Sequence, residues 1–122
     1  MSANEKTDHN VTDKPITIDD FYRVTLKVGR IVEAEAIRGM KKVLRVTVDI
    51  GSEKREIAIG LATYYKPEEL VGKTVVVCTN LQPRKIGEMI SNGMILAADG
   101  HEGKPILLTV DSREVPNGAA VH

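Results

Sequence analysis

The sequence predicts an all-β domain, a small barrel of short strands with one short helix between the third and fourth strands. Two observations carry this prediction. Apolar residues recur at every second position in several short segments, as they do in strands that bury one face. One segment, Tyr64 to Gly72, breaks that pattern with a proline, two glutamates and a closing glycine, which is typical of a short helix.

The chain has 122 residues, of which 42% are hydrophobic, and this fits one domain with one core. We expect the polar residues 1–14 to form a flexible tail and residues 15–122 to form the domain. No apolar run approaches the roughly 20 residues that cross a bilayer, so we expect a cytoplasmic protein with no membrane partner. Cys78 is the single cysteine and the three histidines form no ligand-spaced group with it, so we expect no metal and no cofactor, and a buried, apolar role for Cys78.

The first elements follow from Ile16. Thr17 is a candidate N-cap ahead of two aspartates, so the segment Ile16 to Tyr22 predicts a short N-terminal helix. From Val24 to Ile37 apolar and polar residues alternate, as in one long first strand. Gly29 interrupts the alternation, and we expect a bulge or sharp bend there.

The second strand has the clearest pattern, because four apolar residues alternate with polar ones between positions 44 and 50. Gly51 to Lys54 predicts a hairpin turn, and a third strand follows, ending at Gly60. After the second helix, strands are expected at Thr74–Thr79, Gly93–Ala98 and Ile106–Val110, with a loop at Asn80–Asn92. This order favours a five-stranded Greek-key barrel of the OB-fold type with a C-terminal extension, although a small sandwich or an SH3-like barrel shows similar alternation.

The charge is unevenly distributed along the chain. Formal net charge is zero, but the stretch from Arg23 to Arg45 holds seven basic residues against two acidic ones. A basic face on a neutral protein can bind nucleic acid through counterion release, and the alternative is an ordinary solvated strand surface. The candidate contacts in this stretch are Lys27, Arg30, Lys41, Lys42 and Arg45.

Four segments are more specific than any periodicity. They are Val28–Ala34, Tyr65–Val77, Asn80–Lys85 and Ser91–Ala98. Together they resemble the tRNA-binding OB-fold family, which is found at the carboxy end of dimeric methionyl-tRNA synthetases, in human tyrosyl-tRNA synthetase and its cytokine relative, and as free-standing proteins. The closing segment Asp111 to Gly118 resembles the end of the synthetase-linked and free-standing bacterial versions.

The resemblance implies structure-dependent, largely sequence-independent binding of tRNA, and in the bacterial branch a homodimer that clasps one tRNA. The family motif Ser-x-Gly-Met falls on Ser91, Gly93 and Met94, and it implies an RNA contact for the serine and the methionine. The motif Asn-Leu-x-Pro-Arg-Lys places Asn80, Arg84 and Lys85 beside them. Lys66 and Asn92 complete the set of candidate contacts.

The residues themselves point to the same two loops. OB-folds hold oligonucleotides through the loops that join strands 1 and 2 and strands 4 and 5, which here contain Arg38–Lys42 and Arg84–Lys85. We therefore expect these two cationic turns to lie side by side. Two positions depart from the family pattern: Lys41 replaces an acidic residue, which makes the loop more basic, and Ile59 replaces a serine, so a hydroxyl contact is missing there.

Each candidate also has a structural explanation. The loop cations can be ordinary solubilising charge, Lys66 can flank a helix start, and Ser91 can close a turn. Met94 heads an apolar strand and can belong to the core. One Phe and three Tyr leave little for stacking unpaired bases, so recognition of a folded RNA by cations and hydroxyls is favoured over generic single-strand binding.

No segment predicts catalysis, because the sequence has no Gly-rich phosphate loop and no His-anchored nucleophile. The first hypothesis is therefore a non-catalytic tRNA-binding protein, either an accessory domain or beta subunit of a methionyl-tRNA synthetase or a free-standing homodimer. Its partners would be tRNA and a synthetase catalytic chain. The second hypothesis is a secretion-associated, chaperone-like peptide-binding protein on the same fold, and the third is an assembly module that docks onto a synthetase.

Overall fold

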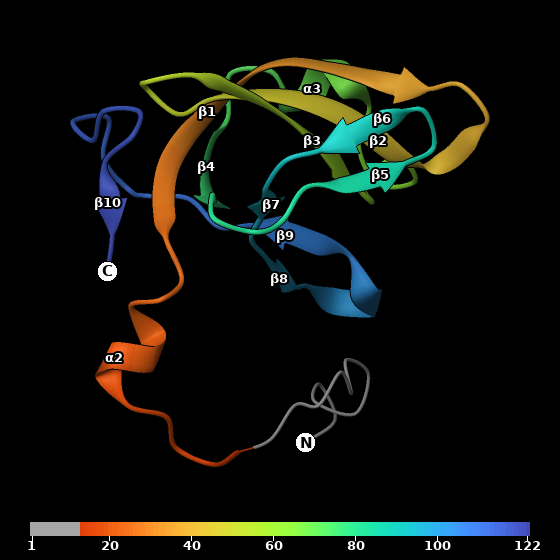
Figure 1. Cartoon of the computed structure of the whole chain (residues 1–122). Coiled ribbons are helices and arrows are strands. Elements are labelled where there is room, and N and C mark those ends of the chain that lie inside the picture. Colours follow the sequence, from red (N-terminus) through yellow and green to blue (C-terminus); the bar gives the residue numbers. More distant parts are fainter. Residues whose placement is uncertain (1–12) are drawn as a thin grey trace.

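The computed structural model describes residues 13–122 (Figure 1). The prediction of a flexible tail at residues 1–14 concerns positions that lie almost entirely outside this range. The helices are α2 (Ile18–Phe21), α3 (Pro67–Leu70) and a 3-10 turn (His101–Gly103). The strands are β1 (Leu26–Ile37), β2 (Met40–Asp49), β3 (Lys54–Ile59), β4 (Thr74–Cys78), β5 (Arg84–Ile86), β6 (Met89–Ser91), β7 (Met94–Ile95), β8 (Ala97–Asp99), β9 (Pro105–Leu107) and β10 (Ala120–Val121).

The main sheet is antiparallel and has the strand order β3-β2-β1-β4-β7, with β10 added on β1. The chain returns to β3 just before β7. There the Asn92 N–H donates to the carbonyl of Glu56 (2.8 Å), and the Ala58 N–H donates to the hydroxyl of Ser91 (2.9 Å). These two bonds join the edges of the sheet around the core where no ladder pairs them. The all-β, OB-like class is confirmed, with α3 between β3 and β4 as expected.

The alternation in β2 decides which face of that strand is buried. Leu44, Val46, Val48 and Ile50 are at most 2% exposed. They pack with apolar residues of β1, β3, β4 and β7 in one cluster. The cluster also includes Leu61, which precedes α3, and Leu70, the last residue of α3. Ile59 is partly buried and packs against the same cluster.

The bulge in β1 does not lie where the sequence predicted it. β1 pairs with β4 through Gly29 without a break in register, and the two register shifts in its pairing with β2 fall between Ile31 and Glu33 and between Ala36 and Ile37. The glycine is needed for a different reason. A β-carbon on Gly29 would lie 2.6 Å from Cγ1 of Val48, so only glycine lets the end of β2 cross β1 this closely.

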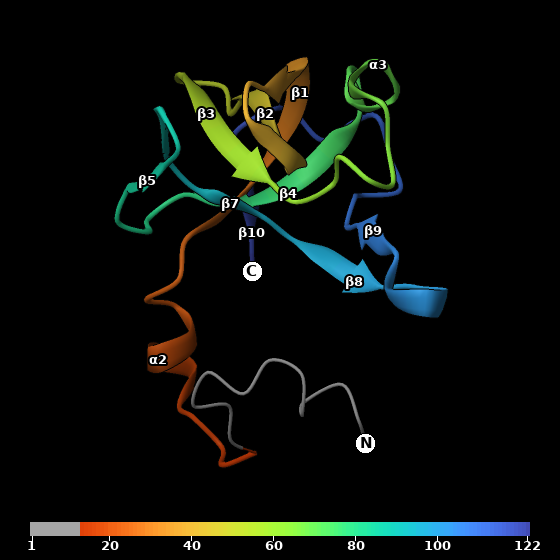
Figure 2. The ribbon, with the colours of Figure 1, turned by 90° about the vertical axis from the view of Figure 1, so that its right-hand side faces the viewer.

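Both helices start with the signals that predicted them. The Thr17 hydroxyl accepts a hydrogen bond from the N–H of Asp20 (3.0 Å) and caps α2. Pro67 opens α3, and the Glu69 carboxylate accepts from the N–H of Lys66 (2.6 Å). Lys66 is therefore the N-cap residue of α3. In Figures 1 and 2, α2 stands away from the barrel, and among residues 13–122 no helix is long and apolar enough to cross a membrane.

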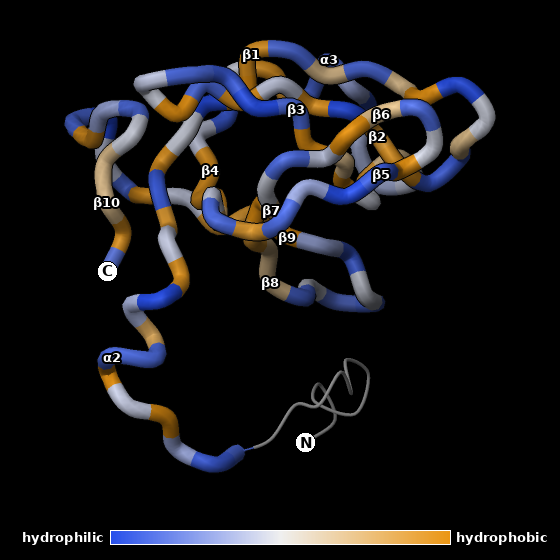
Figure 3. The backbone as a smooth tube through the Cα atoms, in the orientation of Figure 1, coloured by the Kyte–Doolittle hydropathy of each residue, from blue (hydrophilic) through white to orange (hydrophobic). Residues whose placement is uncertain are grey.

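The prediction of a loop at Asn80–Asn92 was wrong, because β5 and β6 form a hairpin there. The expected strand at Gly93–Ala98 divides into β7 and β8, and the one at Ile106–Val110 is the shorter β9. The hairpin gives no alternation signal because Arg84 and Lys85 are both exposed. Figure 3 shows the resulting distribution: β5 is largely hydrophilic, whereas apolar residues concentrate along the strands of the main sheet.

Candidate nucleic-acid interface

The β1–β2 turn and the β5–β6 hairpin lie side by side. Both project toward the same end of the molecule, at the right of Figure 1. They touch at Met40, whose sulfur lies 3.1 Å from the position that a β-carbon on Gly87 would take. Arg38 and Lys41–Lys42 on one hairpin and Arg84–Lys85 on the other are exposed. The structure thus brings together the two cationic turns that the sequence predicted as neighbours.

A concavity of about 770 Å³ opens at the base of the β5–β6 hairpin. It is lined by Asn80, Leu81, Gln82, Pro83, Arg84, Ser91, Gly93 and Met94. Four candidate contacts are therefore gathered in one hollow by the loop after β4 and by the β6–β7 segment. Met94 is 47% exposed, which separates it from the core cluster.

The hairpin cations are free of ion pairs within residues 13–122. Arg45 and Arg55 form ion pairs with glutamates in this part of the chain, whereas the hairpin cations form none there. In the β5–β6 register Arg84 stands opposite Ser91 and Lys85 opposite Ile90, so the hairpin displays its charge beside the concavity. Exposed, unpaired cations are the groups that phosphate oxygens recruit.

Four of the predicted cationic contacts lie elsewhere. Arg45 forms an ion pair with Glu35 on β1 and lies 3.8 Å from a carboxylate oxygen of Glu56 on β3, so its charge is already balanced. Arg30 stands opposite Asp49, at the far end of the β1–β2 ladder from the turn, where it lines a separate 370 Å³ concavity with Arg113.

Lys27 and Lys66 are also set apart from the two hairpins. Lys27 is half-buried in β1 and pairs with Val77 of β4 and Ala120 of β10. Lys66 begins α3, which in Figure 2 lies on the opposite side of the barrel from β5. Lys27 was grouped with the other candidates because it lies in the basic stretch from Arg23 to Arg45, and strand pairing separates it from the turn.

Two polar candidates already have bonds within the fold. The Asn80 carboxamide accepts from the N–H of Thr25 (2.9 Å) and donates to the carbonyl of Arg23 (2.7 Å), so it fastens the chain entering β1. Ser91 is only 2% exposed, and its oxygen accepts from Ala58. A hydroxyl that accepts one bond still has its proton to donate, so Ser91 can do both tasks.

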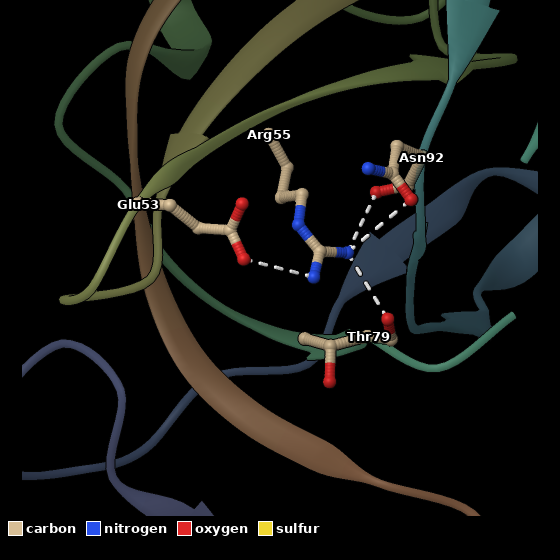
Figure 4. A network of polar contacts seen from close by, with 4 residues as sticks. All are labelled: Glu53, Arg55, Thr79 and Asn92. Atoms are coloured by element: carbon tan, nitrogen blue, oxygen red, sulfur yellow. Dashed lines mark hydrogen bonds and ion pairs between the residues drawn. The ribbon is translucent and has the colours of Figure 1, made fainter.

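The sequence interpretation missed Arg55. Its side chain is 15% exposed, and Figure 4 shows it reaching from β3 toward three other segments. One nitrogen donates to the carbonyl of Thr79 (3.0 Å) and toward Asn92, and the other donates to the carboxylate of Glu53 (3.1 Å). The available signal was its position in β3, which has the same parity as the apolar Ile57 and Ile59.

The Arg55 guanidinium also governs the charge of Glu53. Its hydrogen bond, and then its positive charge, hold the pKa of the Glu53 carboxyl below the ordinary value of 4.5, with a smaller contribution from Lys27. Within residues 13–122 no cluster of three or more His, Cys, Asp and Glu side chains is placed to hold a metal ion. Cys78 is buried as expected, and its thiol also donates a hydrogen bond to the carboxamide oxygen of Asn80 (3.7 Å).

The chain matches known proteins over this whole region. Residues 26–120 match the family described as "Putative tRNA binding domain". The methionine–tRNA ligase of Methanocaldococcus jannaschii is 47% identical over 123 residues, which covers 99% of this chain and 19% of that protein. The ligase of Methanocella arvoryzae is 50% identical over 84% of this chain and 15% of its own length. The chain thus spans less than a fifth of these relatives.

Solved structures agree with the fold. A MetRS-related protein from Pyrococcus horikoshii has a TM-score of 0.83 at 38% identity, covering 89% of this chain and 99% of that one. The CsaA chaperone protein from Picrophilus torridus has a TM-score of 0.79 at 27% identity, covering 88% of this chain and all of that one. From the matched family, the shared sequence and the shared fold it follows that this chain belongs to the tRNA-binding domain family, whose members include the segments matched in methionyl-tRNA synthetases.

Proposed function

We propose that the chain binds folded tRNA through the face formed by the β1–β2 turn and the β5–β6 hairpin. The observation that carries this proposal is the contact between the two hairpins at Met40 and Gly87, which puts two sets of exposed cations at one end of the molecule. A polyanion can span both sets at once. Each phosphate that is neutralised adds counterion release to the binding free energy.

The chemistry of this face favours shape over base identity. None of the four aromatic residues, Phe21, Tyr22, Tyr64 and Tyr65, lines the concavity. Stacking on successive unpaired bases is therefore absent from the proposed interface. Exposed cations and amide or hydroxyl donors instead bind phosphate and ribose oxygens, whose arrangement depends on how the RNA is folded.

A gel-shift titration tests this function. Unfractionated tRNA is titrated at two salt concentrations, with single-stranded DNA of similar length as the comparison. We expect a tRNA complex whose affinity falls steeply with salt and exceeds the affinity for the DNA. Equal binding of both nucleic acids would show that the protein binds polyanions non-specifically and does not recognise the folded shape of tRNA. Absence of a tRNA complex would refute the proposal.

The similarity to methionine–tRNA ligases suggests where such binding would be used. We propose that the domain delivers or holds tRNA in the cytoplasm for a methionyl-tRNA synthetase, or acts as a free-standing tRNA-binding protein. Co-purification with a synthetase catalytic chain in the presence of tRNA would support the first role. Co-purification without any tRNA complex would favour the assembly module, and capture of unfolded peptides in place of tRNA would favour the chaperone-like alternative.

We also propose that the chain forms a homodimer. Ile16 and Ile18 on the α2 segment are 66% and 63% exposed, and Val24 at the entry to β1 is 46% exposed. Val24 borders a second concavity of about 630 Å³, where its apolar neighbours include Leu26, Leu81, Met94 and Leu96. We propose that a second copy covers Ile16, Ile18 and Val24 and leaves exposed Leu81 and Met94, which also line the RNA concavity. Sedimentation at micromolar concentration should show a dimer that Val24→Asp dissociates, and a monomeric wild type would end this part of the proposal.

A further inference from the structure

Asn92 lies between two residues that line the concavity, and nearly all its hydrogen-bonding groups are in use. Its N–H donates to the carbonyl of Glu56 (2.8 Å). One nitrogen of Arg55 donates to both the backbone carbonyl (3.4 Å) and the carboxamide oxygen (3.3 Å) of Asn92. Within the described part of the chain, the group left without a partner is the side-chain NH₂.

The hydrogen bond from Arg55 determines whether the oxygen or the NH₂ group of the Asn92 carboxamide faces the guanidinium. A guanidinium has five N–H donors and no acceptor, so it can only meet the oxygen arm. A glutamine or a hydroxyl at the same place could meet either arm and would leave the amide free to turn over. The arginine therefore fixes the carboxamide with its oxygen inward and its nitrogen available.

Arg55 is itself held tightly enough to impose this orientation. Its guanidinium also donates to the carbonyl of Thr79 (3.0 Å) and to Glu53 (3.1 Å), and its side chain is 15% exposed. Figure 4 shows these partners arriving from different segments around one side chain. The buried Nε of Arg55 has no partner within residues 13–122. An unpaired buried donor lowers the stability of the fold, so the other bonds of Arg55 must offset this loss.

We propose that Arg55 is a positioning residue of the RNA interface, which holds Asn92 so that its NH₂ group donates to oxygen acceptors of the tRNA backbone. This inference rests on the proposed function, because it assumes that RNA occupies the concavity beside Ser91 and Gly93. Asn92 follows Ser91 and precedes Gly93, which both line the concavity with Arg84, so the proposal places its two N–H donors beside that rim. A rim made of donors binds phosphate and 2′-hydroxyl oxygens at any base sequence, in keeping with recognition by shape.

Asn92→Asp separates positioning from folding. The aspartate would keep its oxygens on Arg55 with a stronger, charge-assisted bond, so the thermal midpoint should not fall. The donors toward RNA would be lost, and we expect tRNA affinity to drop about tenfold, as for the loss of a hydrogen bond to a charged group. Gln82→Glu is the matched control, because it adds the same charge to the same concavity without touching Arg55. An equal loss in both variants, or none in Asn92→Asp, would overturn the proposal.

Arg55 is tested by a second pair of variants and a direct readout. Arg55→Lys keeps a donor-only side chain and should bind tRNA within about threefold of wild type, whereas Arg55→Gln should weaken binding about tenfold. The salt slope should stay unchanged in both, since the amide is neutral and its contact with the tRNA releases no counterion. In full-length wild type, the side-chain NH₂ resonances of Asn92 should shift when tRNA is added, and this holds even if an Arg55 variant fails to fold.

The outcomes distinguish failure of the proposed function from failure of the positioning role of Arg55. If wild type forms no tRNA complex, the proposed function itself fails. If the Arg84 and Lys85 cations prove necessary but the Asn92 amide resonances do not respond to tRNA, the function stands and the positioning role of Arg55 is refuted.

Discussion

The sulfur of Met40 lies 3.1 Å from the point that a β-carbon on Gly87 would occupy. Met40 is the first residue of β2, and Gly87 sits in the turn of the β5–β6 hairpin with a φ of +60°. The contact therefore joins segments more than forty positions apart in the sequence. Since each hairpin carries exposed cations, this contact marks where the two charged groups that the proposed function needs lie next to each other.

Replacing Arg84 and Lys85 by alanine should flatten the salt dependence of tRNA binding. If both side chains contact phosphate, the log-log slope of affinity against salt should fall by about two units, one for each contact. The comparison is Arg30→Ala with Arg113→Ala, which removes the same charge from the separate concavity. Equal flattening by the two double variants would show that only total charge matters and would restore Arg30 as an RNA contact.

Asn80→Ala should destabilise the fold. The variant loses the bonds to Thr25 and Arg23, both of them near solvent, so we expect a loss of about 1–2 kcal/mol in the free energy of unfolding measured with urea. Asn80→Asp keeps the acceptor for Thr25 and lacks the donor for Arg23, so it should fall between alanine and wild type. A weaker tRNA complex with an unchanged urea midpoint would instead make Asn80 a direct contact.

Ser91→Ala removes the acceptor for the Ala58 N–H at the seam between β3 and β6. Because Ser91 is buried, water cannot easily replace it, and we expect a loss of about 1–3 kcal/mol in unfolding free energy. The control is Ser112→Ala, since the Ser112 hydroxyl also accepts a backbone N–H, from Glu114, but at an exposed position. We expect a change within about 0.5 kcal/mol for the control, and similar losses in the two variants would contradict burial as the cause.

Glu53 should contribute to stability only above the acid range. Its folded-state pKa lies below 4.5 because Arg55 favours the carboxylate, so this stabilisation is present above pH 4.5 and disappears as the pH falls through the folded-state value. Glu53→Gln should therefore lower the unfolding midpoint at pH 7 and approach wild type near pH 3. The exposed Glu88→Gln serves as the control, and a Glu53→Gln effect that persists at pH 3 would rule out the ion pair as its source.

The elements that the sequence predicted well are those whose signal is local. The alternation of β2 is visible because one face of that strand meets the core from Leu44 to its end. The Thr17 cap and the Pro67 helix start are also local, since each depends on a backbone N–H within three residues. The β5–β6 hairpin was missed because its strands have three residues each, and only Met89 and Ser91 of β6 are buried, which is too short an alternation to reveal a strand.

The site residues that lie in one short segment of the sequence were predictable. The contacts between residues of different strands were not. Asn80 to Lys85 and Ser91 to Met94 are short motifs, and the structure places most of them around one concavity. The ion pairs of Arg45 could not be predicted because its partners, Glu35 and Glu56, come from neighbouring strands. Arg55 was missed for the same reason, since its bonds to Thr79 and Asn92 span 24 and 37 positions.

The pairing of β10 with β1 closes the sheet at its most vulnerable place. Leu26 and Lys27 pair with β4 on one side and with β10 on the other, and the Val28 N–H and carbonyl bond to Ala119 and Gly118. A chain cut before residue 116 would leave this half of β1 as a bare rim of unsatisfied amides. Unpaired amides at a strand edge can pair with strands of other molecules, so residues 118–121 protect the chain from aggregation by covering this edge.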